Sequence, residues 1–256
     1  MGTKVLLALV SAMVVLGSAS AYYNVTYLNT TLILNPNSSA HVLETIGIFV
    51  SNSSVSQYVQ NRDAVATNSQ LSEWQKIIYS TELTQHIVNI HHSTYGFTFL
   101  PGPLVKGYQG GTATLTMSYY INNVTTVSNT APRKFKYTFN DSVFNFENTG
   151  NGEALPSIAR LNIIVPNGSQ IMNIYPVPDS PTPSYMGTYS NDTEFSWFSG
   201  EPLSQFSFSF VTTESLQQEV NTYISSVYRS YSSIIYVLIV VLIVALLVYL
   251  YLKSGR

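Results

Sequence analysis

The sequence contains no cysteine. No disulfide can therefore stabilise the fold, and hydrophobic burial has to do so. The absence also excludes blue-copper sites, cysteine-ligated iron–sulfur clusters and thiol nucleophiles, because each needs a sulfur atom. The motifs G-x-S-x-G and H-E-x-x-H, the P-loop and the dinucleotide fingerprint are missing too. We predict no catalytic residue and no cofactor, and we expect the chain not to be an enzyme.

Charge is scarce as well. Charged residues make up 9% of the 256 residues, with thirteen acidic and eleven basic side chains. This balance argues against a nucleic-acid partner, because phosphate recognition needs clustered bases. The densest basic run, Arg133-Lys134-Lys136, alternates with aromatic residues, and we interpret it as the solvated face of a strand.

The four histidines, His41, His86, His91 and His92, give no spacing typical of a metal site. On one strand, His86 and His92 would lie about 20 Å apart, too far to bind one ion. We therefore predict no metal ligand. The glutamates are scattered, and no spacing indicates an acid–base pair, although carboxylates from distant strands could still meet in a glycan hydrolase.

The two ends of the chain are apolar. Lys4, the run Val5–Leu16 and the small residues up to Ala21 predict a signal peptide over 1–21; an uncleaved N-terminal anchor is the alternative. Residues 234–252 form an uncharged stretch that would span about 28 Å as a helix, close to the thickness of a bilayer core. Lys253 and Arg256 follow it, so the positive-inside rule predicts a cytoplasmic tail over 253–256. The expected location is the cell membrane, with a single pass and an extracytoplasmic N-terminal domain.

Between these ends, the dominant hydrophobic period is two. Residues 112–121 alternate Ala113, Leu115, Met117, Tyr119 and Ile121 with threonine, serine and tyrosine, which is typical of a half-buried strand. Similar alternation around a loop at 35–39 predicts a hairpin, and about ten strands are expected in all. We predict a mainly β fold: an antiparallel β-sandwich over 22–212 with one short helix at 69–79.

Residues 214–230 carry apolar side chains at three- and four-residue steps. This spacing predicts a helical stalk over 213–233, followed by the single C-terminal transmembrane helix. Its narrow apolar seam could pair with a second helix, giving self-association, or could pack on its own domain.

Eight N-x-S/T sequons mark glycosylation candidates, and none has proline in the middle position. They are Asn24, Asn29, Asn37, Asn52, Asn123, Asn140, Asn167 and Asn191. The nineteen tyrosines could line a surface for contact with protein or sugar, or they could serve as strand-forming side chains at the edges of the sandwich.

The segments LNIIVPNGSQIMNIYPVPD and NDTEFSWFSGEPLSQFSFSF, placed ahead of the C-terminal apolar run, resemble the last sheet module of archaeal surface-layer anchors and single-pass archaeal cell-surface proteins. The resemblance implies a structural or adhesive role in the cell envelope. The leading hypothesis is a non-catalytic membrane-anchored surface glycoprotein that contacts the lipid bilayer and an envelope protein or glycan. An accessory single-span subunit of a transporter, secretion or pilus complex is the second hypothesis, and an extracytoplasmic enzyme such as a glycan hydrolase is the third.

Overall fold

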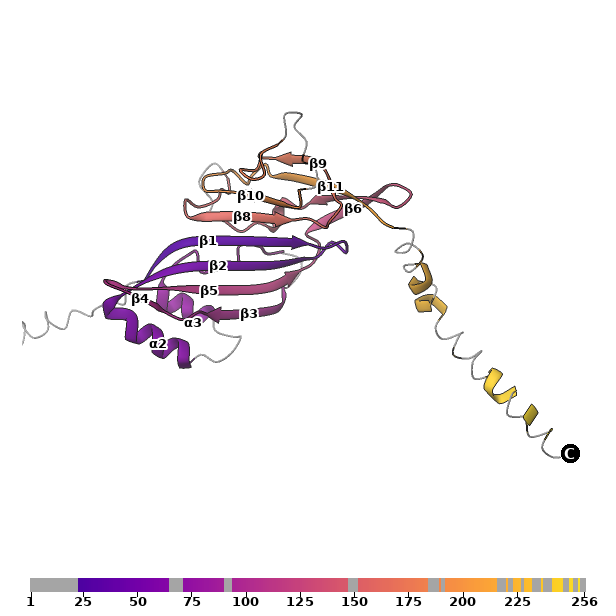
Figure 1. Cartoon of the computed structure of the whole chain (residues 1–256), viewed down its shortest axis with the longest axis horizontal. Helices are drawn as coiled ribbons and strands as arrows, with labels where there is room; N and C mark the ends of the chain where they lie inside the picture. Colours follow the sequence, from indigo (N-terminus) through magenta and orange to yellow (C-terminus); the bar gives the residue numbers. More distant parts are fainter. Residues whose placement is uncertain are drawn as a thin grey trace, which may run out of the picture. The chain divides into compact units, whose positions relative to one another are not determined.

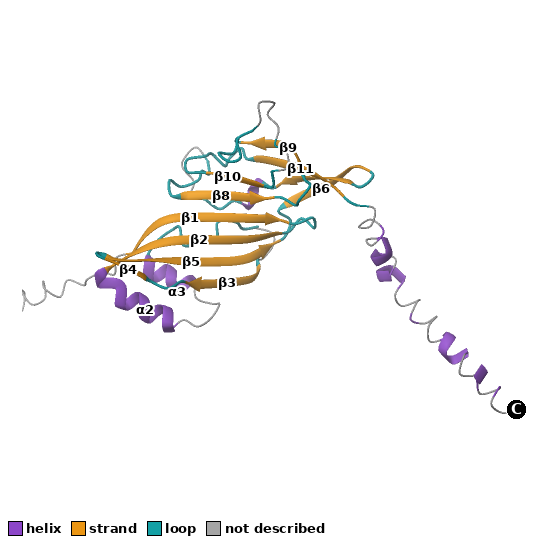
Figure 2. Ribbon diagram, viewed as in Figure 1, coloured by secondary structure: helices purple, strands orange, loops and turns teal. Residues whose placement is uncertain are grey.

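The computed structural model describes residues 23–64, 71–89, 94–146, 152–183, 189 and 192–215, together with 220, 223–226, 228–231, 236, 241–245, 249–250 and 253. Most of the described chain is strand and loop, with a few short helices (Figure 2). The elements, in chain order, are β1 (Tyr23–Leu34), β2 (Ala40–Ser51), α2 (Val55–Ala64), α3 (Leu71–Ile78), β3 (Tyr95–Pro101), β4 (Val105–Gly107), β5 (Gly110–Ile121), β6 (Thr125–Ala131), β7 (Lys134–Phe139), β8 (Ala159–Ile164), β9 (Gln170–Tyr175), β10 (Glu194–Trp197) and β11 (Ser207–Thr213).

The strands form two sheets. The larger has seven strands in the order β10-β8-β1-β2-β5-β3, with β4 also paired to β5 (Figure 1). The smaller has the order β6-β7-β11-β9. The predicted hairpin is present as β1 and β2, and the predicted strand at 112–121 lies within β5. The mainly β prediction is confirmed.

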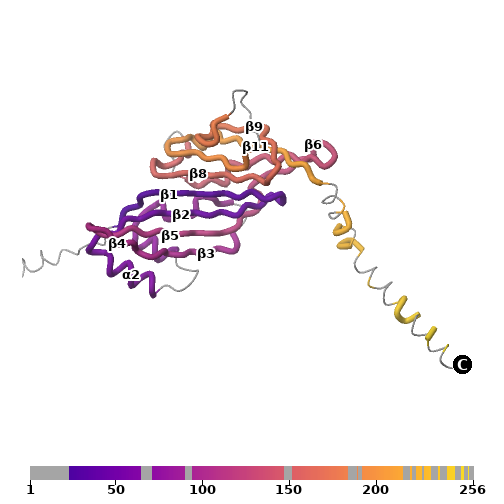
Figure 3. Tube along the Cα trace, in the orientation of Figure 1, coloured from indigo at the N-terminus to yellow at the C-terminus, as the bar shows by residue number. Residues whose placement is uncertain are grey.

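Not every strand pair is antiparallel. Strand β8 lies parallel to β1, although the two come from different halves of the chain (Figure 3). The absence of a strand-helix-strand rhythm led to the expectation of purely antiparallel pairing, which is wrong at this position. Here the chain returns to the sheet after crossing the smaller sheet, so no single crossover helix marks the parallel pair in the sequence.

Two different layers cover the inner face of the large sheet. On the β10 side the layer is the smaller sheet: Phe195 and Trp197 of β10 contact Phe208 and Phe206, with ring centroids 5.6 and 5.0 Å apart. On the β3 side the layer is helical, where Trp74 of α3 packs between Tyr58 of α2 and Phe99 of β3. Because the chain has no disulfides, its stability has to come from burial of apolar surface such as these large rings.

The helix predicted at 69–79 is observed as α3, which places Trp74 and Ile78 in the core. Helix α2 was not predicted. Its residues show almost no apolar periodicity, and only Tyr58 is buried. Tyr58 donates a 2.7 Å hydrogen bond to the carbonyl oxygen of Gly102, and burial raises its pKa to about 12. One aromatic anchor thus holds a helix that hydrophobic periodicity could not reveal.

No helix among the described residues is both long enough and apolar enough to cross a membrane. This corrects the transmembrane helix predicted over 234–252, and with it the predicted fold class and the predicted single-pass location. Apolar composition sets hydropathy, whereas a span also needs one continuous helix of about 20 residues. The described helical residues in this region are the short stretches 241–245 and 249–250, with 236; the rest of 234–252 lies outside the described residues.

Two further predictions fall wholly or partly outside the described residues. The signal peptide over 1–21 lies outside them entirely. The stalk over 213–233 lies partly outside, and 223–226 and 228–231 are helical. The chain divides into two compact units, one formed by Met1–Ser128 and Lys136–Thr212, the other by Asn129–Phe135 and Thr213–Arg256. Within the second unit, the Glu214 N–H donates a 2.9 Å hydrogen bond to the Arg133 carbonyl oxygen.

Candidate functional site

A row of large side chains crosses the outer face of the seven-stranded sheet. Ile33 of β1 lies opposite His41 of β2, His41 lies opposite Tyr120 of β5, and Tyr120 lies opposite Tyr95 of β3. Successive side chains of a strand point to opposite faces, so these residues face away from the core that Val42 and Tyr119 enter. Tyr95 is 47% exposed, Tyr120 39% and Ile33 36%. We call Ile33, His41, Tyr120 and Tyr95 the outer row.

The rings of the outer row are stacked on one another. The His41 and Tyr120 centroids lie 4.6 Å apart with an interplanar angle of 21°, and those of Tyr120 and Tyr95 lie 5.5 Å apart at 19°. His41 Nε2 is also 2.7 Å from the Ser118 hydroxyl oxygen, which fixes the ring across β2 and β5. Because the flat ring faces meet each other, the row presents ring edges and hydroxyl groups to the surroundings.

A bulge in β3 places Tyr95 in this row. Phe99 and Pro101 of β3 are buried, so strict alternation would turn Tyr95 inward as well. The register with β5 shifts between Tyr95 and Thr98, and Gly96 adopts a positive φ of 63°. Bulges re-aim side chains in this way, and glycine accepts the left-handed conformation without strain. The outer row therefore depends on Gly96.

Tyr27 extends the same face. Its ring lies directly over Gly47 of β2, where an added Cβ would come within 2.1 Å of Tyr27 Cε1. The Tyr27 and Thr114 hydroxyl oxygens are 3.2 Å apart. Tyr27 lines a shallow depression together with Thr26, Pro103, Val105 and Thr112.

At the β10 side of this face, a polar network joins three strands. Asn162 Nδ2 donates to Asn29 Oδ1 at 2.7 Å and to Thr31 Oγ1 at 3.2 Å, both in β1. Asn162 Oδ1 accepts from Arg160 Nε at 2.9 Å and from the Ser196 hydroxyl of β10 at 2.7 Å. The Arg160 guanidinium also lies 4.9 Å from the centre of the Phe198 ring. Since the amide of Asn162 is used by its neighbours, this network fixes strand register more readily than it binds a ligand.

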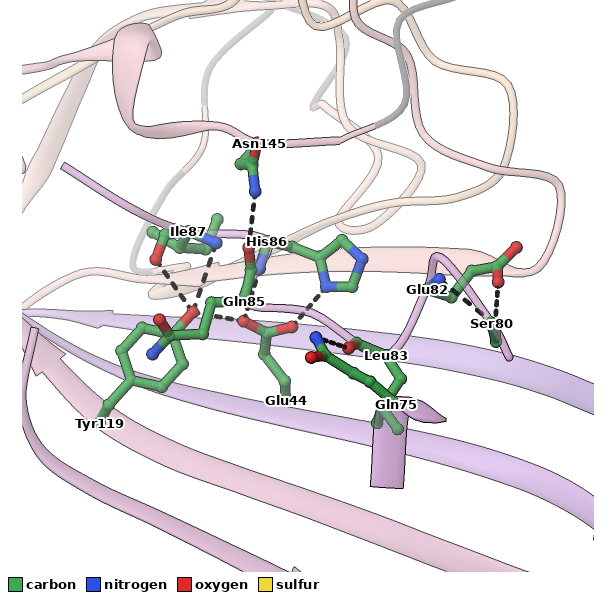
Figure 4. Close-up of polar contacts among 10 residues, drawn as sticks. All are labelled: Glu44, Gln75, Ser80, Glu82, Leu83, Gln85, His86, Ile87, Tyr119 and Asn145. Atoms are coloured by element: carbon green, nitrogen blue, oxygen red, sulfur yellow. Dashed lines mark hydrogen bonds and ion pairs between the residues drawn. The ribbon is translucent and has the colours of Figure 1, made fainter. Parts of the chain in front are cut away.

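On the inner face of the seven-stranded sheet lies a buried charged cluster, formed by Glu44, His86 and Tyr119 (Figure 4). Glu44 is fully buried, and its Oε1 accepts the His86 N–H at 2.9 Å and a hydrogen bond from the Tyr119 hydroxyl. Its Oε2 lies 2.5 Å from His86 Nδ1. The Tyr119 hydroxyl also lies 3.0 Å from the Ile87 carbonyl oxygen, and burial, followed by the adjacent Glu44 charge, raises the pKa of Tyr119 well above its usual value. The cluster attaches the segment after α3 to β2 and β5.

The same segment is held from its other side. Asn145 N donates to the His86 carbonyl oxygen at 2.8 Å, and the Asn145 side chain donates to the Gln85 carbonyl oxygen at 2.9 Å. The His86 ring stacks on Phe146 with centroids 5.1 Å apart. Residues 85–87 are therefore held between the large sheet and the 143–146 segment.

Although Glu44 and His86 resemble the acid–base half of a triad, no serine or threonine hydroxyl within the described residues is hydrogen-bonded to the His86 ring. A hollow beside His86 is lined by Thr81, Glu82 and Thr84, and Glu82 is hydrogen-bonded to Ser80. The His41–Ser118 pair lies on a sheet face where the backbone N–H groups of β2 and β5 serve the strand ladder, so none is aimed at an oxyanion.

The structure describes two of the four histidines, and these two lie at different places. His86 is buried in the charged cluster and His41 belongs to the outer row, while His91 and His92 lie outside the described residues. Among the residues that the structure does describe, no three metal-ligating side chains come together. Within the described part of 85–89 the chain forms isolated bridges, one of them between Ile87 and Phe144.

The sequons occupy three kinds of position. Five asparagines lie on the exposed surface: Asn24, Asn37, Asn52, Asn123 and Asn167. Two are partly buried: Asn29, in the middle of β1 between β2 and β8, and Asn140, at the end of β7. Asn191 lies outside the described residues.

Sequence reasoning missed both the charged cluster and the outer row. Glu44 and Tyr119 occupy strand positions whose side chains face inward. A buried glutamate needs a hydrogen-bonding partner, so Glu44 at such a position is the signal that could have indicated the cluster. The outer row left a weaker signal, Gly96 next to Tyr95. No protein-family model and no curated protein matches the sequence.

Proposed function

We propose that the protein is a non-catalytic binding protein and that the outer face of its seven-stranded sheet, centred on the outer row, contacts a partner protein. The observation that carries the proposal is the stacked set of His41, Tyr120 and Tyr95 on the outer face of the sheet. Large aromatic side chains that stay partly exposed in a folded protein are typical of protein interfaces, where tyrosine supplies contact area at a low entropic cost.

The sequence is compatible with either a protein or a glycan as the partner. A sugar is recognised by stacking its C–H groups on a free aromatic face, and the stacked faces of Tyr120 are occupied by His41 and Tyr95. Ring edges and hydroxyl groups on a flat, pleated surface suit the backbone and side chains of another protein better. The amide of Asn162 is already hydrogen-bonded to its neighbours in the sheet, so it is not available to the hydroxyl groups of a sugar.

Leu43 offers a site for the experiment. It lies on the outer face of β2, two residues after His41 and opposite Thr31 of β1, and it is 37% exposed. A photo-crosslinking amino acid at Leu43 in the full-length chain should give one discrete protein adduct in the producing cells. The matched control is the same amino acid at Tyr108, which is 98% exposed in the turn between β4 and β5 and is expected to give no discrete adduct.

Once the adduct is identified, affinity decides the proposal. Tyr120→Ala removes the central ring and should weaken binding at least about tenfold, the loss expected for an aromatic anchor. Tyr120→Phe keeps the stack and should bind within about threefold of the wild type. Equal adducts at both positions, or equal affinity for Tyr120→Ala and wild type, would refute the proposal. Glycan binding abolished by Tyr27→Ala would show instead that sugar is the partner.

A further inference from the structure

Three sequons from distant parts of the chain meet at one end of the sheets. Asn37 lies in the turn between β1 and β2, Asn123 follows β5, and Asn140 follows β7. Val124 joins them: its N–H donates to the Ser38 carbonyl oxygen at 2.9 Å, and its carbonyl oxygen accepts the Asn140 N–H at 2.9 Å. Ser38 and Val124 are the middle residues of the first two sequons, so all three sequons form one hydrogen-bonded cluster.

The hydroxyl residues of these sequons differ in accessibility. Ser39, two residues after Asn37, is 4% exposed, and Thr125, two residues after Asn123, is 6% exposed. Ser39 donates its hydroxyl to Asn37 Oδ1 at 2.7 Å, whereas the buried Thr125 Oγ1 has no hydrogen-bond partner among the described residues. Ser142, which completes the Asn140 sequon, is exposed.

This difference matters because the sequon is read through its third residue. An enzyme that recognises N-x-S/T has to contact the serine or threonine hydroxyl as well as the asparagine amide. In the folded chain the hydroxyl groups of Ser39 and Thr125 are covered by protein, while that of Ser142 is not.

We propose that Asn37, Asn123 and Asn140 carry N-linked glycans that form one cluster at this end of the sheets, and that Asn37 and Asn123 are modified before the chain folds. In each transfer, the asparagine Nδ2 forms a bond to the anomeric carbon of a sugar carried on a lipid phosphate. The bond from that carbon to the phosphate oxygen breaks, the lipid phosphate leaves with the electron pair, and Nδ2 releases one proton to a base of the transferase. The proposal uses the export predicted from residues 1–21 and is independent of the outer-row proposal.

The cluster lies at the same end of the seven-stranded sheet as the outer row. Ile33 and His41 flank the turn that holds Asn37. The Tyr95 hydroxyl donates to Oδ1 of Asn122, the residue before Asn123, at 3.4 Å. Asn29 is the one sequon asparagine found in the middle of a strand on the outer face among the described residues, and its Oδ1 is engaged by Asn162. Glycans at the strand ends would instead surround loops, where bulky, hydrated groups are tolerated best.

The experiment compares folded and unfolded acceptors. Full-length chain made without glycan is incubated with an oligosaccharyltransferase and a lipid-linked oligosaccharide, and occupancy of each site is measured by mass spectrometry of its peptides. In the folded wild-type chain, Asn140 should be modified at least about tenfold faster than Asn37 and Asn123. In Leu115→Asp, which places a charge in the core and is intended to unfold the chain, all three should be modified at similar rates.

Two controls complete the design. Thr125→Ala should abolish modification of Asn123 in both chains, whereas Ser142→Ala should abolish that of Asn140 alone. Chain exported from a glycosylating cell should carry glycan at all three sites. Modification of Asn123 in the folded chain as fast as Asn140, or an exported chain without glycan at Asn37 and Asn123, would overturn the proposal.

Discussion

Replacing Glu44 tests how the buried charged cluster stabilises the fold. Glu44→Leu removes the acceptor of three hydrogen bonds, from the His86 N–H, the His86 ring and the Tyr119 hydroxyl. Tyr119 can turn to the Ile87 carbonyl oxygen, 3.0 Å away, and the imidazole can move its proton to Nε2. The His86 N–H has no second acceptor among the described residues, and an orphaned buried donor costs about 1–3 kcal/mol.

The expected total is therefore about 2–4 kcal/mol of unfolding free energy, with the two weaker losses adding about 1 kcal/mol. Glu44→Gln gives a different expectation. Its amide oxygen can accept from the His86 N–H and from Tyr119, and its NH₂ group can donate to an unprotonated His86 Nδ1. All three contacts survive, so the expected loss is below about 1 kcal/mol.

Urea unfolding measures both variants. The two tryptophans, Trp74 and Trp197, are fully buried, so their fluorescence should report the loss of the core. Glu73→Leu, at an exposed position of α3, is the matched control and should change stability by no more than about 0.5 kcal/mol. The reasoning fails if Glu44→Leu costs no more than Glu44→Gln.

Three further predictions concern the bulge, the core alternation and a carboxyl group. Gly96→Ala forces alanine into a left-handed conformation, with its Cβ 3.2 Å from a Tyr120 ring carbon. Urea unfolding should show that the unfolding free energy falls by about 1–2 kcal/mol. Partner binding should also be lost, because Tyr95 leaves the outer row. Leu115→Asp should unfold the chain, seen as lost near-ultraviolet circular dichroism, whereas Thr116→Asp on the outer face should change stability by less than about 1 kcal/mol. Burial, then the nearby Asp141 charge, raises the pKa of Glu153 above its usual value. This carboxyl group therefore favours the folded state below its unfolded pKa, and that contribution is lost as pH rises through its folded pKa. Glu153→Gln should raise the melting temperature at pH 7 and have no such effect at pH 3.

Much of the fold could be predicted because the alternation of buried and exposed residues along a strand is visible in the sequence itself. The alternation of Leu115, Met117 and Tyr119 with polar neighbours fixed the face of β5 before any partner was known, and each of these side chains is fully buried. The helix α3 was predictable for the same reason, since its apolar residues recur at helical spacing. Period and composition are local properties, and local properties survive without tertiary contacts.

Local patterns fail where one residue or one distant contact decides the outcome. A single glycine turned Tyr95 to the outer face, and one tyrosine held α2 in place. The span over 234–252 was predicted from hydropathy alone, and no helix among the described residues is long and apolar enough to cross a membrane.

The sequence by itself determined that the protein is mainly β, that its core has to be held without disulfides, and where its sequons stand. Only the tertiary structure decided that Glu44 meets His86 and Tyr119, that β8 joins β1 in parallel, and that three sequons meet around Val124. The physical reason is distance along the chain. Strand pairing brings together residues far apart in sequence, and their hydrogen bonds depend on a register that no local pattern contains.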